Sequence, residues 1–132
     1  MDKRGQISIE FVLIIAFMLV LVLLFGAYAA DANEKNVVSS AARSGAMDAA
    51  SNLLLNNSIT QPIQVTDITT VDIGQNETIF INVIGSISNS TNQTMRSYAL
   101  QSIAAQGYIL NTTNSTDPFI STSRRTYKIQ IV

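Results

Sequence analysis

The chain has no cysteine, no histidine and no tryptophan among its 132 residues. Without cysteine there is no disulfide framework, and without cysteine and histidine the usual ligands of zinc and other transition metals are missing. Cysteine and histidine also carry out much of the nucleophilic and redox chemistry of enzymes, so such chemistry is not expected here. We therefore expect no catalytic residues, no metal site and no cofactor.

Charge is also scarce: 13 % of the residues are Asp, Glu, Lys or Arg, against about 25 % in an ordinary soluble domain. The formal net charge is −1 and the basic residues form no stripe along the sequence. A nucleic-acid-binding surface needs such a stripe to neutralise phosphates. Nucleic acid is therefore not expected as a partner.

A long segment without charged residues lies near the start of the chain. Residues 11–30 contain no charged side chain, and twenty helical residues at about 1.5 Å each span a hydrocarbon core of about 30 Å. Lys3 and Arg4 are the basic residues before it. Because basic flanks stay in the cytoplasm, we expect the precursor to cross the cytoplasmic membrane with residues after the segment outside the cell.

The segment from residue 6 to residue 57 is predicted to be helical throughout, since the first proline is Pro62. Its second half, residues 31–57, is an amphipathic continuation with two stripes at spacings of three and four. The small and apolar stripe, suited to packing on a sheet, is Val38, Ala42, Gly45, Ala49 and Leu53. The more polar stripe is Asn36, Ser40, Arg43 and Met47. Gly26 and Gly45 each cost about 1 kcal/mol relative to alanine in a helix interior, so local bending is expected there.

Residues 58–132 change to a period of two and predict a small extracellular β-rich domain. Residues 63–73 and 78–84 are rich in β-branched side chains and read as a hairpin around residues 74–77. Asp67 interrupts the inward row of the first strand, which predicts a bulge or break. Residues 127–131 alternate apolar and polar side chains, as a last strand does.

The part between these strands is predicted as polar loops around short elements. Residues 85–94 and 111–126 are the loops, and residues 108–111 form a brief strand. A short helix, stopped by Gly107, is indicated by Met95, Ala99, Leu100, Ile103 and Ala104. The predicted fold is α+β: a long N-terminal helix whose second half packs on a small antiparallel sheet.

The acceptor pattern for N-linked glycans, N-x-[ST], occurs six times, always after the apolar segment. The six candidate asparagines are Asn56, Asn76, Asn89, Asn92, Asn111 and Asn114. The pattern is typical of surface loops of secreted proteins. Glycosylation is the prediction, and accidental recurrence in a chain rich in Asn, Ser and Thr is the alternative.

The other charged residues give no sign of a catalytic or Ca²⁺ site. The carboxylates of the β-rich part are Asp67, Asp72, Glu77 and Asp117. They lack the D-x-[DN]-x-[DN]-G spacing of a calcium loop, and the chain has no glycine-rich phosphate loop. We expect these carboxylates to be solvated. The Arg124-Arg125 pair is expected to be solvated as well, or to contact a neighbouring subunit or an anionic surface.

The first eleven residues carry a motif: Lys3-Arg4-Gly5, then Gln6-Ile7-Ser8-Ile9-Glu10-Phe11, then the apolar helix. It resembles the class III signal peptide of archaeal type IV pilin-like proteins, whose pattern is Q-x-S-x-E-F. The resemblance implies that a prepilin peptidase recognises this motif and cuts between Gly5 and Gln6. Residues 1–5 would leave as a leader, and the helix of residues 6–30 would be retained and form the core of a homopolymeric filament. Its implied recognition residues are Lys3, Arg4, Gly5, Gln6, Ser8, Glu10 and Phe11.

The same resemblance implies a type IV pilus-like filament on the cell surface. We expect adhesion as its use, and motility or a minor, priming role in the filament is the alternative. A separate assembly ATPase and a membrane platform protein would drive polymerisation, so no ATP site is expected in this chain. Gln6, Glu10 and Phe11 would be the assembly residues.

The position of Glu10 fits assembly on physical grounds. Cleavage creates an α-amino group at Gln6, and in a bundle of apolar helices the Glu10 carboxylate can pair with that group of another subunit. Removing one partner of a buried pair costs about 3–5 kcal/mol, so the pair can fix the axial register. The simpler interpretation is that Glu10 marks the membrane boundary.

A competing hypothesis rests on Ala27-Tyr28-Ala29, an A-x-A pattern that an ordinary signal peptidase could cut. The product would be a secreted protein that begins at Ala30 and does not polymerise. An uncut chain would instead be a membrane-anchored surface glycoprotein, because an all-round apolar helix suits lipid and a filament core equally.

Overall fold

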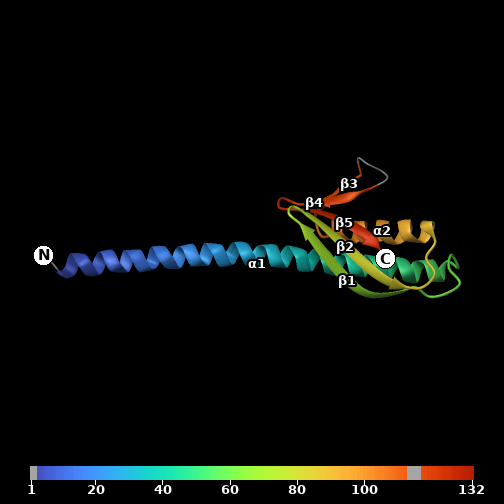
Figure 1. Ribbon diagram of the computed structural model, residues 1–132, viewed down its shortest axis with the longest axis horizontal. Helices are drawn as coiled ribbons and strands as arrows, with labels where there is room; N and C mark the ends of the chain where they lie inside the picture. Colours follow the sequence, from blue (N-terminus) through green and yellow to red (C-terminus); the bar gives the residue numbers. More distant parts are fainter. Residues whose placement is uncertain (1–2, 113–116) are drawn as a thin grey trace. The chain divides into compact units, whose positions relative to one another are not determined.

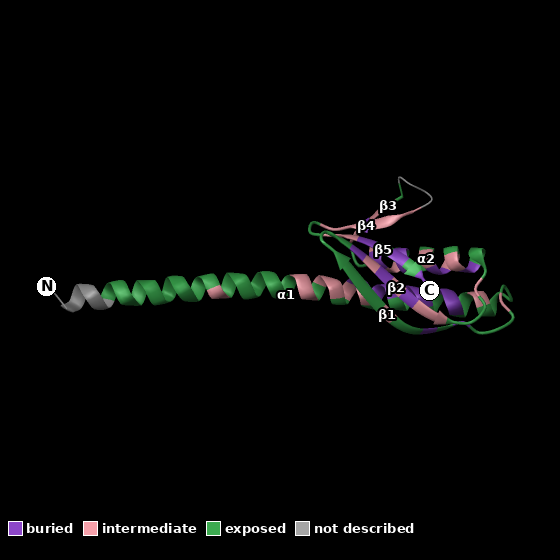
Figure 2. Ribbon diagram, viewed as in Figure 1, coloured by how far each residue is buried: buried purple, intermediate pink, exposed green. Residues whose placement is uncertain are grey.

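The computed structural model describes residues 3–112 and 117–132, with side chains from Ser8 onward. The first element, α1, spans Lys3–Leu55 as one helix, which confirms the predicted helix to within three residues at each end. The chain forms two compact units, one up to Asn36 and one from Val37 to Val132. In the part that the structure describes, the first unit is helix alone, and most of its side chains from Ser8 onward are exposed (Figure 2).

The second unit contains a five-stranded sheet in the order β1-β2-β5-β4-β3 (Figure 1). The strands are β1 (Gln64–Ile73), β2 (Asn76–Ile84), β3 (Ile109–Asn111), β4 (Phe119–Ser121) and β5 (Thr126–Ile131). Neighbouring strands are antiparallel, except that β2 and β5 run parallel. The sheet is therefore mostly antiparallel, and the predicted α+β class is confirmed.

The core of the second unit lies between the sheet, the second half of α1 and α2 (Asn89–Ala104). Inward side chains alternate along the strands, as in β5, where Tyr127, Ile129 and Ile131 are buried and the residues between them are not. The buried residues of α1 are Val38, Ala41, Ala42, Gly45, Ala46, Ala49 and Ala50. The predicted small-residue stripe is thus buried, apart from half-buried Leu53, while its polar neighbour stripe is exposed.

Gly45 marks a close approach of α1 to α2. A Cβ atom added there would lie 2.5 Å from the Tyr98 carbonyl oxygen and 2.8 Å from the Ala99 Cα. A methyl group does not fit at such distances, so a side chain at this position would push the helices apart. Gly26 has open space around it, and α1 is unbroken at both glycines. Close packing against α2 explains why glycine is found at position 45, which the sequence alone did not explain.

The end of α1 is a Schellman turn. Asn57 has φ 53°, its N–H donates to the Leu54 oxygen at 3.2 Å, and the Ser58 N–H donates to the Leu53 oxygen at 3.0 Å. Asparagine is one of the few residues that tolerates this left-handed conformation. The helix therefore ends two residues before the predicted end at residue 57, and this turn is what ends it.

The hairpin and its irregularity are also as predicted. Val65 pairs with Val83 and Asp67 pairs with Asn82, so Thr66 is the extra residue of a bulge. The turn is shorter than the predicted residues 74–77, because β2 already begins at Asn76. Gly74, with φ 69°, is the first of the two turn residues, where hairpins of this length favour glycine.

Two sequence predictions need correction. Residues 89–94 are not loop but the first turns of α2, where the Ser88 side chain accepts a hydrogen bond from the Thr91 N–H as an N-cap. The predicted loop of residues 111–126 contains β4, which was missed. The sheet is mostly antiparallel, as predicted, but the parallel pairing of the last strand with β2 was not foreseen.

Candidate functional site

The motif residues form the first turns of α1. The backbone of residues 3–11 is helical, so Gln6 and Glu10 are four residues apart and share one face of the helix. Ser8, Glu10 and Phe11 are exposed, with Phe11 at 61 %. Cleavage before Gln6 would create an amino group at the start of the helix, about one turn before Glu10.

The helix that follows offers apolar side chains in every direction. Every residue from Ser8 to Ala30 is exposed except Leu21, which is intermediate. The exposed large side chains in this part range from 44 % at Ile15 to 75 % at Tyr28. The described chain has one helix long and apolar enough to cross a membrane, with a mean hydropathy of 3.0 in its most apolar window. This finding depends on the length and composition of the helix alone.

Burial of this surface would release a large free energy. Each large aliphatic or aromatic side chain contributes about 1.5–3 kcal/mol when it is fully removed from water. More than ten such side chains lie between Phe11 and Phe25, so the gross gain is on the order of tens of kcal/mol. Lipid or other helices of the same kind can provide that burial.

Glu10 is the only charged residue among the described side chains before Asp31. It is exposed and has no ion-pair partner among the side chains that the structure describes. A carboxylate beside an apolar segment stays in water or pairs with a cation when that segment is buried. The site therefore combines an apolar surface with one carboxylate at its edge.

The glycosylation candidates occupy different kinds of backbone. Asn56 is exposed in the turn after α1, and Asn76 is exposed at the start of β2. Asn89 and Asn92 belong to the first turn of α2, and Asn111 is half-buried at the end of β3. Asn114 lies outside the described residues. The loop position expected of a sequon therefore applies to only part of the set.

The charges expected to be solvated form two ion-pair clusters instead. Arg125 Nη1 lies 2.6 Å from Asp72 Oδ2 and 3.6 Å from Glu77 Oε2. Glu77 is 1 % exposed, so it is a buried carboxylate that needs this guanidinium nearby. Arg124 remains exposed. The expectation of a solvated pair was thus wrong for Arg125, as it was for Glu77.

The second cluster surrounds Asp117, which pairs with Lys128 at 2.7 Å and with Arg96. Two hydrogen bonds hold the pKa of Asp117 below its usual value of 3.8; the bond from Lys128 has the larger effect and the bond from Arg96 the smaller one. The cluster joins α2, the approach to β4, and β5. Asp67, by contrast, is exposed as predicted.

Two of the three tyrosines of the second unit pack in its core or at the edge of it. Tyr127 is buried at 1 % and Tyr108 packs against the core, while Tyr98 is 36 % exposed on α2.

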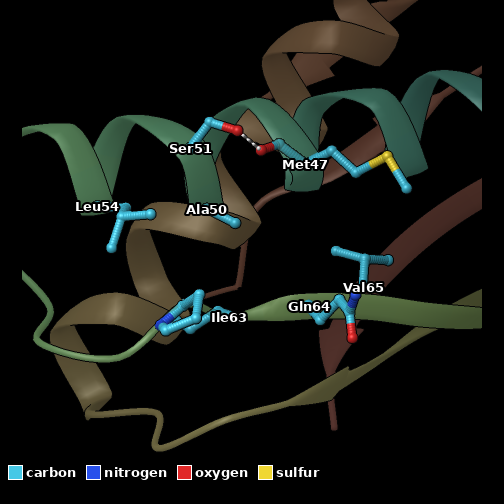
Figure 3. Close-up of a pocket in the computed structure, with 8 residues that line it drawn as sticks. Met47, Ala50, Ser51, Leu54, Ile63, Gln64 and Val65 are labelled. Atoms are coloured by element: carbon cyan, nitrogen blue, oxygen red, sulfur yellow. Dashed lines mark hydrogen bonds between the residues drawn. The ribbon is translucent and has the colours of Figure 1, made fainter.

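The second unit has open grooves on its surface. One has a volume of about 380 Å³ and lies between α1 and β1 (Figure 3). Met47, Ala50 and Leu54 line it from α1, and residues 62–65 line it from the other side. No titratable side chain faces this groove, so it offers no acid–base chemistry. Among the described residues there is no group of three Asp, Glu, His or Cys side chains that could hold a metal ion.

Comparison with known families gives one result, and it concerns the N-terminal site. Residues 3–28 match the family model described as Class III signal peptide. A search of curated proteins found no match to the chain. The match confirms the class III signal peptide and is consistent with a type IV pilin-like protein, secreted or assembled, that is structural in character. It implies, in general terms, a prepilin peptidase and an assembly machinery as partners.

Proposed function

We propose that the chain is the structural subunit, or pilin, of an archaeal type IV pilus-like filament on the cell surface, with adhesion as its use. The observation that carries the proposal is the class III signal peptide of residues 3–28. The precursor is held in the cytoplasmic membrane with its N-terminus inside, and a prepilin peptidase cuts between Gly5 and Gln6. Lys3 and Arg4 orient the precursor and leave with the leader.

Assembly then moves the retained helix from lipid into a bundle of identical helices. The all-round exposure of its apolar side chains supports this step, since such a helix can be covered on every side by neighbours. An assembly ATPase and a membrane platform protein supply the work. Contacts among these helices provide most of the cohesion of the filament.

Glu10 sets the register in this scheme. Its carboxylate pairs with the α-amino group at Gln6 of another copy, and Phe11 begins the apolar contact. Because an unmatched buried charge costs about 3–5 kcal/mol, copies shifted along the axis are disfavoured.

The second unit forms the outer surface of the filament. Its own core, with Ile79, Ile81 and Tyr127 fully enclosed, supports a domain that folds around the second half of α1. The alternative remains a surface glycoprotein that does not polymerise: a secreted one, which the A-x-A pattern at residues 27–29 favours, or a membrane-anchored one if the chain is not cut.

Replacement of the Glu10 carboxylate tests the assembly role. Although Glu10 belongs to the implied recognition motif, Gln keeps its size, and Glu10→Gln should still insert and be cut, which the intact mass of the variant checks. It should nevertheless give few or no filaments by electron microscopy, because the charge pair is lost. Asp48→Asn is the matched control, since Asp48 is an exposed carboxylate farther along the same helix, and it should give normal filament numbers. Normal numbers from Glu10→Gln would refute the role given to Glu10.

A further inference from the structure

The six sequons differ in how far the folded domain presents them, and four of them lie wholly within the described residues. These four begin at Asn56, Asn76, Asn89 and Asn92. A glycosyltransferase must reach the asparagine amide and the hydroxyl two residues later on an accessible stretch of chain. A sequon fixed inside a helix or a central strand meets this need only after local unfolding.

The sequon at Asn89 is built into the start of α2. Its hydroxyl residue, Thr91, is 4 % exposed. The Thr91 hydroxyl lies 2.8 Å from the Ser88 hydroxyl, and the Thr91 N–H donates to the same Ser88 oxygen at 3.2 Å. Presenting this sequon would remove the N-cap of the helix and expose a buried residue.

The sequon at Asn92 belongs to the same helical turn. The Asn92 N–H donates to the Ser88 carbonyl oxygen at 2.9 Å. The Thr94 hydroxyl donates to the Ser90 carbonyl oxygen at 3.0 Å. Both ends of this sequon are therefore engaged in the helix.

The sequon at Asn76 lies in β2, which has a partner strand on each side. Its middle residue, Glu77, is opposite Asp72 of β1 and Tyr127 of β5. Glu77 is also 1 % exposed and close to Arg125. Freeing this segment would open the sheet between two strands.

The sequon at Asn56 is held only by the last turn of α1. Asn56, Asn57 and Ser58 are all exposed, and their N–H groups donate to the oxygens of residues 52–54. The Ser58 hydroxyl has no hydrogen-bond partner among the described residues. Helix ends fray readily, and opening this turn exposes no fully buried residue, because its neighbours in the core, Leu53 and Ile59, are only half-buried.

We propose that Asn56 is the preferred N-glycan acceptor among these four and that modification acts on the folded domain. Nδ2 of Asn56 forms the new bond to the anomeric carbon of a lipid-linked glycosyl phosphate. The carbon–oxygen bond to phosphate breaks, the phosphate leaves with the bonding electron pair, and the amide loses one proton. The proposal rests on the proposed function only in placing residues after the apolar segment outside the cell.

Site occupancy measured by mass spectrometry of the peptides from the native full-length protein tests this inference. Occupancy at Asn56 should exceed that at Asn76, Asn89 and Asn92 by about tenfold or more, since the others require loss of a cap or of strand pairing. Ser58→Ala should abolish the glycan at Asn56, and Ser58→Thr should keep it. Thr94→Ala, which removes the Asn92 sequon, should leave the glycan at Asn56 unchanged.

Comparable occupancy at the four sites, or an unmodified Asn56, would overturn the inference. The same measurement on Glu10→Gln, which is expected not to assemble, separates it from the filament proposal. Glycan on Asn56 of an unassembled chain supports the acceptor assignment whether or not the protein forms filaments.

Discussion

Gly45 offers a direct test of how α1 packs in the second unit. In Gly45→Ala, the new Cβ would lie 2.5 Å from the Tyr98 oxygen, 2.8 Å from the Ala99 Cα and 2.8 Å from the Ser102 Cβ. Carbon atoms in good contact are about 3.5–4.0 Å apart, and two of these three neighbours are backbone atoms that no side-chain rotation can move. The two helices must therefore separate by about 1 Å at this point.

The magnitude follows from two opposing terms. Overpacking a core costs about 1–3 kcal/mol, and the backbone contacts place Gly45→Ala in the upper part of this range. Replacing glycine by alanine in a helix returns about 1 kcal/mol. The free energy of unfolding therefore falls by about 1–2 kcal/mol. For a unit of this size, each kcal/mol lowers Tm by about 4–8 °C.

Thermal unfolding of the full chain in detergent, followed by the near-UV signal of the tyrosines, measures this loss. Ser44→Ala is the matched control, because Ser44 is the exposed neighbour and alanine there only improves helix propensity. The control should unfold at the wild-type temperature or slightly above it. A Gly45→Ala variant as stable as the wild type, or more stable, would refute the close packing and leave Gly45 as a flexible point.

Two further predictions concern the ion-pair clusters. Arg125→Met leaves the buried Glu77 carboxylate without its guanidinium and should lower the free energy of unfolding by about 3–5 kcal/mol, measured by thermal unfolding; a loss below about 1 kcal/mol would contradict the buried pair. Because the pKa of Asp117 is lower in the folded state than its usual value of 3.8, its pairs stabilise the fold above that pH, and this contribution is lost as the pH falls through the folded-state pKa. Asp117→Asn should therefore lower the free energy of unfolding at pH 7 by no more than about 1 kcal/mol, as for a half-exposed cluster, and the difference from wild type should vanish in acid; a difference that is constant with pH would contradict it.

Local patterns predicted much of this fold. The spacing of Val38, Ala42 and Ala49 identified the buried face of α1, and Asp67 correctly indicated the bulge beside it in the chain. The Q-x-S-x-E-F motif is contiguous, so it could be recognised without any structure. These features depend on neighbours a few residues apart, which a sequence shows directly.

The failures depend on contacts between distant residues or on polar side chains. Residues 89–94 are all polar, so their helical start rests on the Ser88 cap and the enclosure of Thr91, which no hydrophobic period signals. The parallel pairing of β5 with β2 places Tyr127 beside Glu77 and brings Arg125, 53 residues away in sequence, to Asp72. The strand order decides these pairs, and the sequence contains no local sign of it.

The N-terminal residue of the subunit in purified native filaments tests the central claim most directly. Intact-mass and N-terminal sequencing should find a chain that begins at Gln6 and keeps the whole apolar helix. A chain that begins at Ala30, or filaments that lack this protein while it occurs only as a single molecule in the membrane or medium, would contradict the claim.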